Sequence, residues 1–158
     1  MFLTQAKGLT IRTMTYPTLL GAAGWDRPEW AVAFYPGEMP EEWRLTYYST
    51  QFHCVFLPAD TWLKTTADDF AAWAADTHEQ FVFLLEGASP GDLPPRLAGR
   101  AIGLARDDPR LLWFDRDTSL KSLAGQITGH TEVTYLLSSD GDLGQIERVR
   151  TLLELLGR

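Results

Sequence analysis

Apolar and polar residues alternate along the chain in a pattern that predicts strands and helices in turn. Short apolar runs at residues 19–23, 54–59 and 81–85 have the length of buried strands, and Gly24 closes the first of them. Residues 40–52 carry apolar residues at helical spacing. The same spacing occurs after residues 66–69, which themselves resemble a helix-capping sequence. Strands that alternate with helices are typical of a mainly parallel α/β sheet.

The second half of the chain has a looser pattern. Residues 88–99 are rich in Pro and Gly and predict a loop, with or without one short helical turn. Two short apolar runs follow, at 101–105 and 111–114, and they fit either a hairpin or one interrupted strand. Thr118 is a candidate cap for the next helix, residues 133–137 predict a strand, and residues 143–156 predict a final helix ended by Gly157.

Composition indicates one ordinary globular domain over residues 1–158. Apolar residues make up 45% and charged residues 22%, both close to globular averages, and no composition shift or repeat marks a boundary. Residues 10–16 alternate apolar and polar positions, so residues 1–17 are interpreted as an N-terminal arm or an added edge strand.

Aromatic and glycine positions in the first half resemble the DUF72 (YecE-like) family. The resemblance rests on Gly24-Trp25, Trp30, Phe34-Tyr35-Pro36, Tyr47-Tyr48, residues 54–57, Phe70, Trp73 and Phe81. Residues 131–156 also resemble the last strand, loop and helix of that family. The resemblance implies a TIM-type β/α barrel, and the family has no settled biochemical activity.

The strand motif of the family is changed in this chain. Where the family has Val-Glu-Ile-Asn, the chain has Val-Phe-Leu-Pro at 55–58, so Phe56 replaces a carboxylate and Pro58 an amide. Glu86 stands where the family often carries a lysine, and Trp62 replaces a tyrosine. A phenylalanine neither moves a proton nor binds a metal. We therefore interpret Phe56 and Pro58 as a lost site, and expect Phe56 to be buried against Trp25 or Trp62.

The chain is also short for a complete barrel, which takes about 250 residues, whereas this chain has 158. An internal deletion explains the difference. The sequence therefore predicts a shortened TIM-barrel-like α/β fold, with a mainly parallel sheet of about five or six strands and flanking helices.

Candidate chemistry gathers at the predicted carboxyl ends of the strands, where parallel α/β folds hold their reacting groups. Asp26, Asp60 and Asp140 are the acids that an enzyme would use as general acid and base. The aromatic residues near the first loops either line a ligand pocket or pack the loops; they are Trp25, Trp30, Tyr35 and Trp62.

Charge and spacing argue against several classes of partner. The net charge of −7 disfavours nucleic acid and anionic membranes, and no segment reaches the length of a membrane span. Cys54 is the single cysteine, so no internal disulfide forms, and its apolar surroundings indicate a buried thiol. No metal or cofactor site is expected, because the three histidines lack ligand spacing. A cytoplasmic location follows by default.

These observations favour a non-catalytic binding or assembly protein derived from a DUF72-type barrel. Removing strands from a barrel leaves open edges and an apolar interior, so we expect a homo-oligomer or a protein partner. Two alternatives stay open: a hydrolase-like enzyme that acts on a small or phosphorylated substrate through the strand-end carboxylates, and a sensor of a small ligand.

Overall fold

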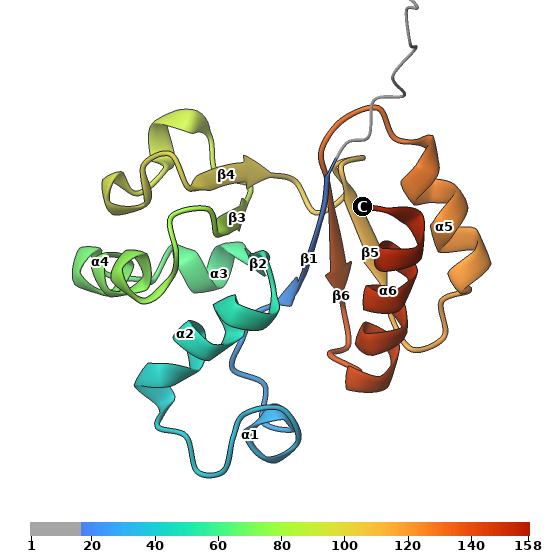
Figure 1. Ribbon diagram of the computed structural model, residues 1–158. Helices are drawn as coiled ribbons and strands as arrows, with labels where there is room; N and C mark the ends of the chain where they lie inside the picture. The colour runs from blue at the N-terminus through green and yellow to red at the C-terminus, as the bar shows by residue number, and fades with distance from the viewer. Residues whose placement is uncertain (1–16) are drawn as a thin grey trace, which may run out of the picture.

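The computed structural model describes residues 17–158, and its centre is a six-stranded sheet in which every pair of neighbours is parallel (Figure 1). The predicted arm or strand at residues 10–16 lies outside the described residues. The strands are β1 (Thr18–Ala23), β2 (Cys54–Leu57), β3 (Val82–Glu86), β4 (Ala101–Leu104), β5 (Leu111–Phe114) and β6 (Thr134–Ser138). The predicted fold class, a shortened barrel-like sheet with flanking helices, is confirmed.

The helices of the described chain are α1 (Trp30–Ala33), α2 (Glu41–Gln51), α3 (Ala59–Trp62), α4 (Ala67–Asp76), α5 (Leu120–Gly129) and α6 (Leu143–Leu156). The four longer helices lie where the pattern predicted them, whereas the single-turn helices α1 and α3 were not predicted. The predicted loop at 88–99 contains two single 3₁₀ turns, Pro90–Asp92 and Pro95–Leu97.

Hydrogen bonds at the helix ends explain the boundaries. Thr66 begins α4 as predicted, because its hydroxyl accepts from the Asp69 amide at 3.1 Å. Helix α5 is capped by Ser119, whose hydroxyl accepts from the Ser122 amide at 3.2 Å, and not by Thr118. The Thr118 hydroxyl instead accepts from the Asp115 amide at 2.9 Å.

The prediction for the two short runs after the loop was wrong. Residues 101–104 and 111–114 form neither a hairpin nor one strand, because β4 pairs with β3 and β5 pairs with β6, at opposite edges of the sheet. A four-residue apolar run indicates a buried strand, but it carries no information about which strand it pairs with.

The strand order is that of a β/α barrel opened at one place. In a closed barrel each strand lies beside the next, and the last strand closes on the first. Here β1 pairs with the final strand β6, whereas the consecutive strands β4 and β5 are not neighbours. The sheet is therefore a curled half-barrel that is open between β4 and β5, and only residues 105–110 join its two edges.

Side chains on the two faces of the sheet belong to separate apolar clusters, because neighbours along a strand point to opposite faces. The helix-covered face packs strand residues such as Val55 and Phe83 against helix residues such as Trp30 and Ile146. The buried residues of the concave face come from strands alone: Cys54, Phe56, Leu84, Leu104, Leu111, Tyr135 and Leu137.

All seven of these concave residues are at most 6% exposed. The centre of the expected uncovered apolar interior is therefore buried within one chain by the curl of the half-barrel. The apolar residues packed around it are partly buried: Leu19, Ala23, Val82, Ile102, Trp113 and Val133. Within residues 17–158, no helix combines the length and apolar character needed to cross a bilayer.

Candidate functional site

The mouth of the half-barrel lies at the carboxyl ends of the strands, where ligands bind in parallel α/β folds. Phe56 of β2 is fully buried there, and the Trp113 ring of β5 meets its ring edge to face at 5.0 Å. The Arg106 guanidinium covers both rings, 4.9 Å from the Phe56 centroid and 5.3 Å from that of Trp113. The position of the family carboxylate is thus filled by two aromatic rings under a cation.

The neighbours of Phe56 differ from those predicted. It was expected to lie against Trp25 or Trp62, but the alternation along β2 turns it to the concave face. Trp25 packs edge to face on Trp73 at 5.0 Å, and Trp62 donates from its indole nitrogen to the Glu86 carbonyl at 2.9 Å. The sequence did not identify Trp113 or Arg106, because both come from the segment whose pairing it left open.

Glu86 ties three segments together at this mouth. One carboxylate oxygen pairs with Arg106 Nε at 3.2 Å, and the other accepts from the Ala59 amide at 3.0 Å. The Arg106 carbonyl in turn accepts from the Trp113 indole at 2.9 Å. The glutamate that replaces the family lysine therefore holds residues 105–110 across the opening of the half-barrel.

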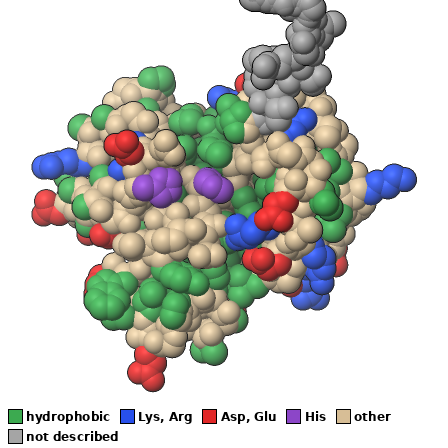
Figure 2. All heavy atoms as spheres, in the orientation of Figure 1, with side chains coloured by type: hydrophobic (Ala, Val, Ile, Leu, Met, Phe, Trp, Pro, Cys, Tyr) green, Lys and Arg blue, Asp and Glu red, His purple; other side chains and the backbone are tan. Residues whose placement is uncertain are grey.

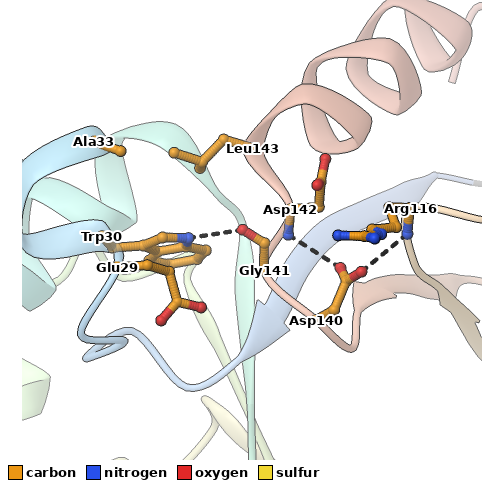
Figure 3. Close-up of a pocket in the computed structure, with 8 residues that line it drawn as sticks. All are labelled: Glu29, Trp30, Ala33, Arg116, Asp140, Gly141, Asp142 and Leu143. Carbon is orange, nitrogen blue, oxygen red and sulfur yellow. Dashed lines mark hydrogen bonds between the residues drawn. The ribbon is translucent and has the colours of Figure 1, made fainter.

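The three candidate acids have different surroundings. Asp26 pairs with Arg44 at 2.5 Å, and its side chain is 50% exposed. Asp60 is exposed in the first turn of α3. Asp140 accepts from the backbone amides of Arg116 and Asp142, each at 3.0 Å (Figure 3).

The hydrogen bonds that Asp140 accepts determine the direction in which its pKa shifts. Burial alone would raise its pKa, but the amide donors, Asp142 and Arg116, outweigh burial and lower the pKa below its ordinary value. The Asp142 side chain caps α6 by accepting from the Gln145 amide at 2.8 Å. Each of these two carboxylates accepts hydrogen bonds that hold the loop before α6.

Three of the four candidate pocket aromatics are buried in packing contacts. Trp30 is fully buried, stacks on Phe52 and donates to the Gly141 carbonyl at 2.8 Å (Figure 3). The Tyr35 hydroxyl donates to the Trp25 carbonyl, and burial raises the pKa of Tyr35. Trp62 is 7% exposed.

Trp25 alone of the four is partly exposed beside an apolar cavity. This cavity has about 250 Å³ and lies between the Trp25 and Trp73 rings and the end of β2, with Leu57, Thr61 and Asp26 on its walls. A second cavity, of about 330 Å³, lies at the start of α6 between Trp30, Arg116 and Asp140 (Figure 3). Asp26 and Asp140 thus line different cavities.

Among residues 17–158, no group of three or more His, Cys, Asp or Glu side chains is arranged to hold a metal ion. Cys54 is fully buried on the concave face, and burial raises the pKa of its thiol. These side chains therefore supply neither a metal centre nor a reactive thiolate at the mouth.

Residues 19–89 match the model of the family described as protein of unknown function DUF72. This segment belongs to the DUF72 family. It contains β2, β3 and all but the first residue of β1, together with Phe56 and Glu86, so the resemblance indicated by the aromatic positions is confirmed.

A solved structure of a DUF72 family protein from Thermotoga maritima is similar to this chain with a TM-score of 0.61. The sequences are 11% identical, and the match covers 90% of this chain and 100% of that one. At this identity the likeness concerns the fold alone. No curated protein matches the chain.

Proposed function

We propose that the chain is a non-catalytic binding or assembly protein built on an opened DUF72-type barrel. The observation that carries the proposal is the filled mouth: fully buried Phe56 lies under Arg106 at 4.9 Å, where the family has a carboxylate. Aromatic rings offer no proton to transfer and no ligand to a metal. Arg106 Nε already pairs with Glu86 at 3.2 Å, which weakens the attraction of this cation for a substrate anion.

A small-ligand sensor is the second candidate, and the cavity of about 250 Å³ beside Trp25 favours it. Its walls join two indole rings to a hydroxyl and a carboxylate, a combination that suits a small flat ligand. A hydrolase that uses Asp26, Asp60 and Asp140 has less support. Both carboxylate oxygens of Asp140 already accept hydrogen bonds from backbone amides, and Asp26 forms an ion pair with Arg44.

We propose that the chain acts in the cytoplasm, either as a homo-oligomer or together with a protein partner. The acidic net charge of −7 supports a protein partner over nucleic acid or an anionic membrane.

Two measurements on the full chain test the proposal. The first is a hydrolysis assay with activated esters and phosphate monoesters, compared between the wild type and the variants Asp26→Asn and Asp140→Asn. We expect all three proteins to give the background rate. Turnover by the wild type that Asp26→Asn abolishes, with its circular dichroism unchanged, would contradict the proposal.

The second measurement is calorimetric titration with small aromatic probes such as indole and benzamidine. Binding that Trp25→Ala removes would favour the sensor over the assembly protein, and the absence of binding would favour assembly.

A further inference from the structure

Helices α2 and α4 and the loop after β1 enclose a hollow of about 460 Å³ with acidic walls. We call this surface the acidic hollow. Two indole rings, those of Trp25 and Trp73, lie among its carboxylates. The carboxylates come from all three segments: Asp26, Glu41, Glu42, Asp69 and Asp76.

Four of the five carboxylates have no cation paired with them. Asp26 pairs with Arg44 at 2.5 Å, and no ion pair within residues 17–158 includes any of the other four. Helix dipoles favour the acids in the first turns of α2 and α4, but they do not favour Asp76, which is the last residue of α4. The hollow therefore carries a negative field that attracts a cation from outside the chain.

The indole rings lie beside these acids. Asp69, Trp73 and Asp76 are spaced four and three residues apart, so they are neighbours on one face of α4. Trp25 packs edge to face on Trp73 at 5.0 Å, and both side chains are partly buried. An indole ring attracts a cation, and a neighbouring carboxylate adds to that attraction. This combination suits a lysine or arginine side chain, whose apolar stem lies along the rings while its charge reaches the acids.

The loop that carries Trp25 is held in place by the rest of the fold. Gly24 has a φ of 82°, and its amide donates to the Phe56 carbonyl at 3.0 Å. The Tyr35 hydroxyl donates to the Trp25 carbonyl. A partner therefore meets a preformed surface and orders few side chains on binding.

Another side of α2 provides a contrast. Met39, Trp43 and Tyr47 line an apolar hollow there that has no charged residue in its walls. Figure 2 shows apolar side chains gathered at the lower left of the molecule, over α2. That hollow does not select a partner by charge, whereas the acidic hollow does. The charge of the acidic hollow is spread over two helices and a loop, so it suits several cations along one chain better than a single small cation.

We propose that the acidic hollow binds a lysine- or arginine-rich segment of a protein partner. This inference rests on the proposed assembly function and names the chemistry of the partner. One cation of the segment lies against Trp25 and Trp73, and its neighbours along the segment pair with the carboxylates of α2 and α4. Each exposed ion pair contributes little by itself, so we expect several pairs to form and the affinity to be in the micromolar range.

Calorimetric titration of the full chain with a lysine-rich peptide tests the binding. The titration is done at physiological salt, where a Debye length of about 8 Å suppresses long-range attraction. The peptide should bind, and the same peptide with acetylated lysines should not, because acetylation removes the charge. Spermidine is the small-cation probe, and it should bind about tenfold more weakly because it makes fewer simultaneous contacts.

A pair of charge-matched variants tests the location. Asp69→Asn combined with Asp76→Asn should weaken peptide binding by about fivefold or more. The matched control combines Asp107→Asn with Asp117→Asn, which removes the same charge from two exposed acids outside the hollow. The control should change the affinity by less than about twofold, because distant exposed charges are screened.

Carbodiimide coupling locates the contact independently, since it joins carboxylates directly to the amines of the bound peptide. Mass spectrometry of the coupled protein identifies the linked acids. We expect them to be Glu41, Glu42, Asp69 and Asp76.

The inference would be overturned by any of four outcomes: no binding of the peptide, binding of spermidine as tight as that of the peptide, equal affinities of the two double variants, or coupling mainly at acids outside the hollow. Each would leave the proposed non-catalytic function standing, with a different partner or surface. Turnover in the hydrolysis assay would instead contradict the function and leave the peptide binding untouched.

Discussion

Phe56 shows what one substitution does to a strand end. A carboxylate at this position would need donors or a metal, whereas a phenylalanine needs only volume and a neighbour for its ring face. The structure provides both, because Trp113 packs against the ring and Arg106 lies over it. The negative face of an aromatic ring attracts a guanidinium, so the cation and the ring stabilise each other.

Replacing Phe56 tests this packing. Phe56→Ala should lower the free energy of unfolding by about 3–5 kcal/mol, because it removes a buried ring and leaves a cavity under Arg106. Urea denaturation measures the change. Leu63→Ala is the control, since Leu63 is mostly exposed and its loss should cost less than about 0.5 kcal/mol. Equal losses for the two variants would show that Phe56 is not buried in solution.

Asp140 gives a prediction about pH. Its pKa in the folded chain is lower than in the unfolded chain, because the amides of Asp142 and Arg116 favour the carboxylate over the opposing effect of burial. The stabilisation is therefore fully present above the unfolded pKa of about 3.9. It disappears as the pH falls through the lower folded pKa.

Asp140→Asn should accordingly be less stable than the wild type at pH 6, and the difference should shrink as the pH approaches 2.5. Urea denaturation across this range measures it. A difference that stays constant with pH would mean that the charge of Asp140 does not contribute.

At the scale of elements, local patterns predicted most of the fold. The apolar runs of β1, β2, β3 and β6, the capping hydroxyl of Thr66 and the terminating Gly157 each depend on residues close in sequence. The placement of β4 and β5 depends on pairing with distant strands, which a four-residue run does not specify. The filled mouth was predictable only in part: the loss of the carboxylate was visible in Phe56, but its neighbours Trp113 and Arg106 come from that unplaced segment.

A close approach at the edge strand gives an element-scale prediction. A Cβ atom at Gly103 in β4 would lie 1.7 Å from the Ala88 carbonyl oxygen, so the loop after β3 packs directly on this glycine. Gly103→Ala should force the loop or strand to move and should cost about 1–3 kcal/mol.

Gly125→Ala adds the same methyl group as Gly103→Ala, but at a position with free space around it. Gly125 is an exposed position in α5, and an added methyl group there would meet no atom within 4 Å. Alanine should therefore stabilise the chain by up to about 1 kcal/mol. Thermal denaturation of both variants checks the opposite signs. A neutral Gly103→Ala would show that the loop does not pack on β4.

At the scale of the whole molecule, the opened barrel closes its own interior. The two sheet edges are joined by residues 105–110, and the pair of Glu86 with Arg106 at 3.2 Å fixes this connection over the mouth. The buried concave residues therefore need no partner to cover them.

Arg106→Ala should loosen this closure with little effect on global stability. The Arg106 side chain is 52% exposed, and an exposed contact between a cation and a ring contributes about 0.5–1 kcal/mol. The free energy needed to open the mouth locally should fall by at least the same amount. Hydrogen exchange at the Trp113 indole, which donates to the Arg106 carbonyl, measures it: exchange should accelerate in the variant. An unchanged rate would mean that Arg106 does not hold the mouth closed.

The most direct test of the filled interior is the reactivity of Cys54 towards a small thiol reagent. It is the single cysteine of the chain and lies fully buried on the concave face. In the native protein, labelling should be slower than in urea-unfolded protein by about a thousandfold or more, since access requires an opening that costs about 5 kcal/mol. Labelling of the native chain at nearly the unfolded rate would show an open barrel interior and would contradict the account.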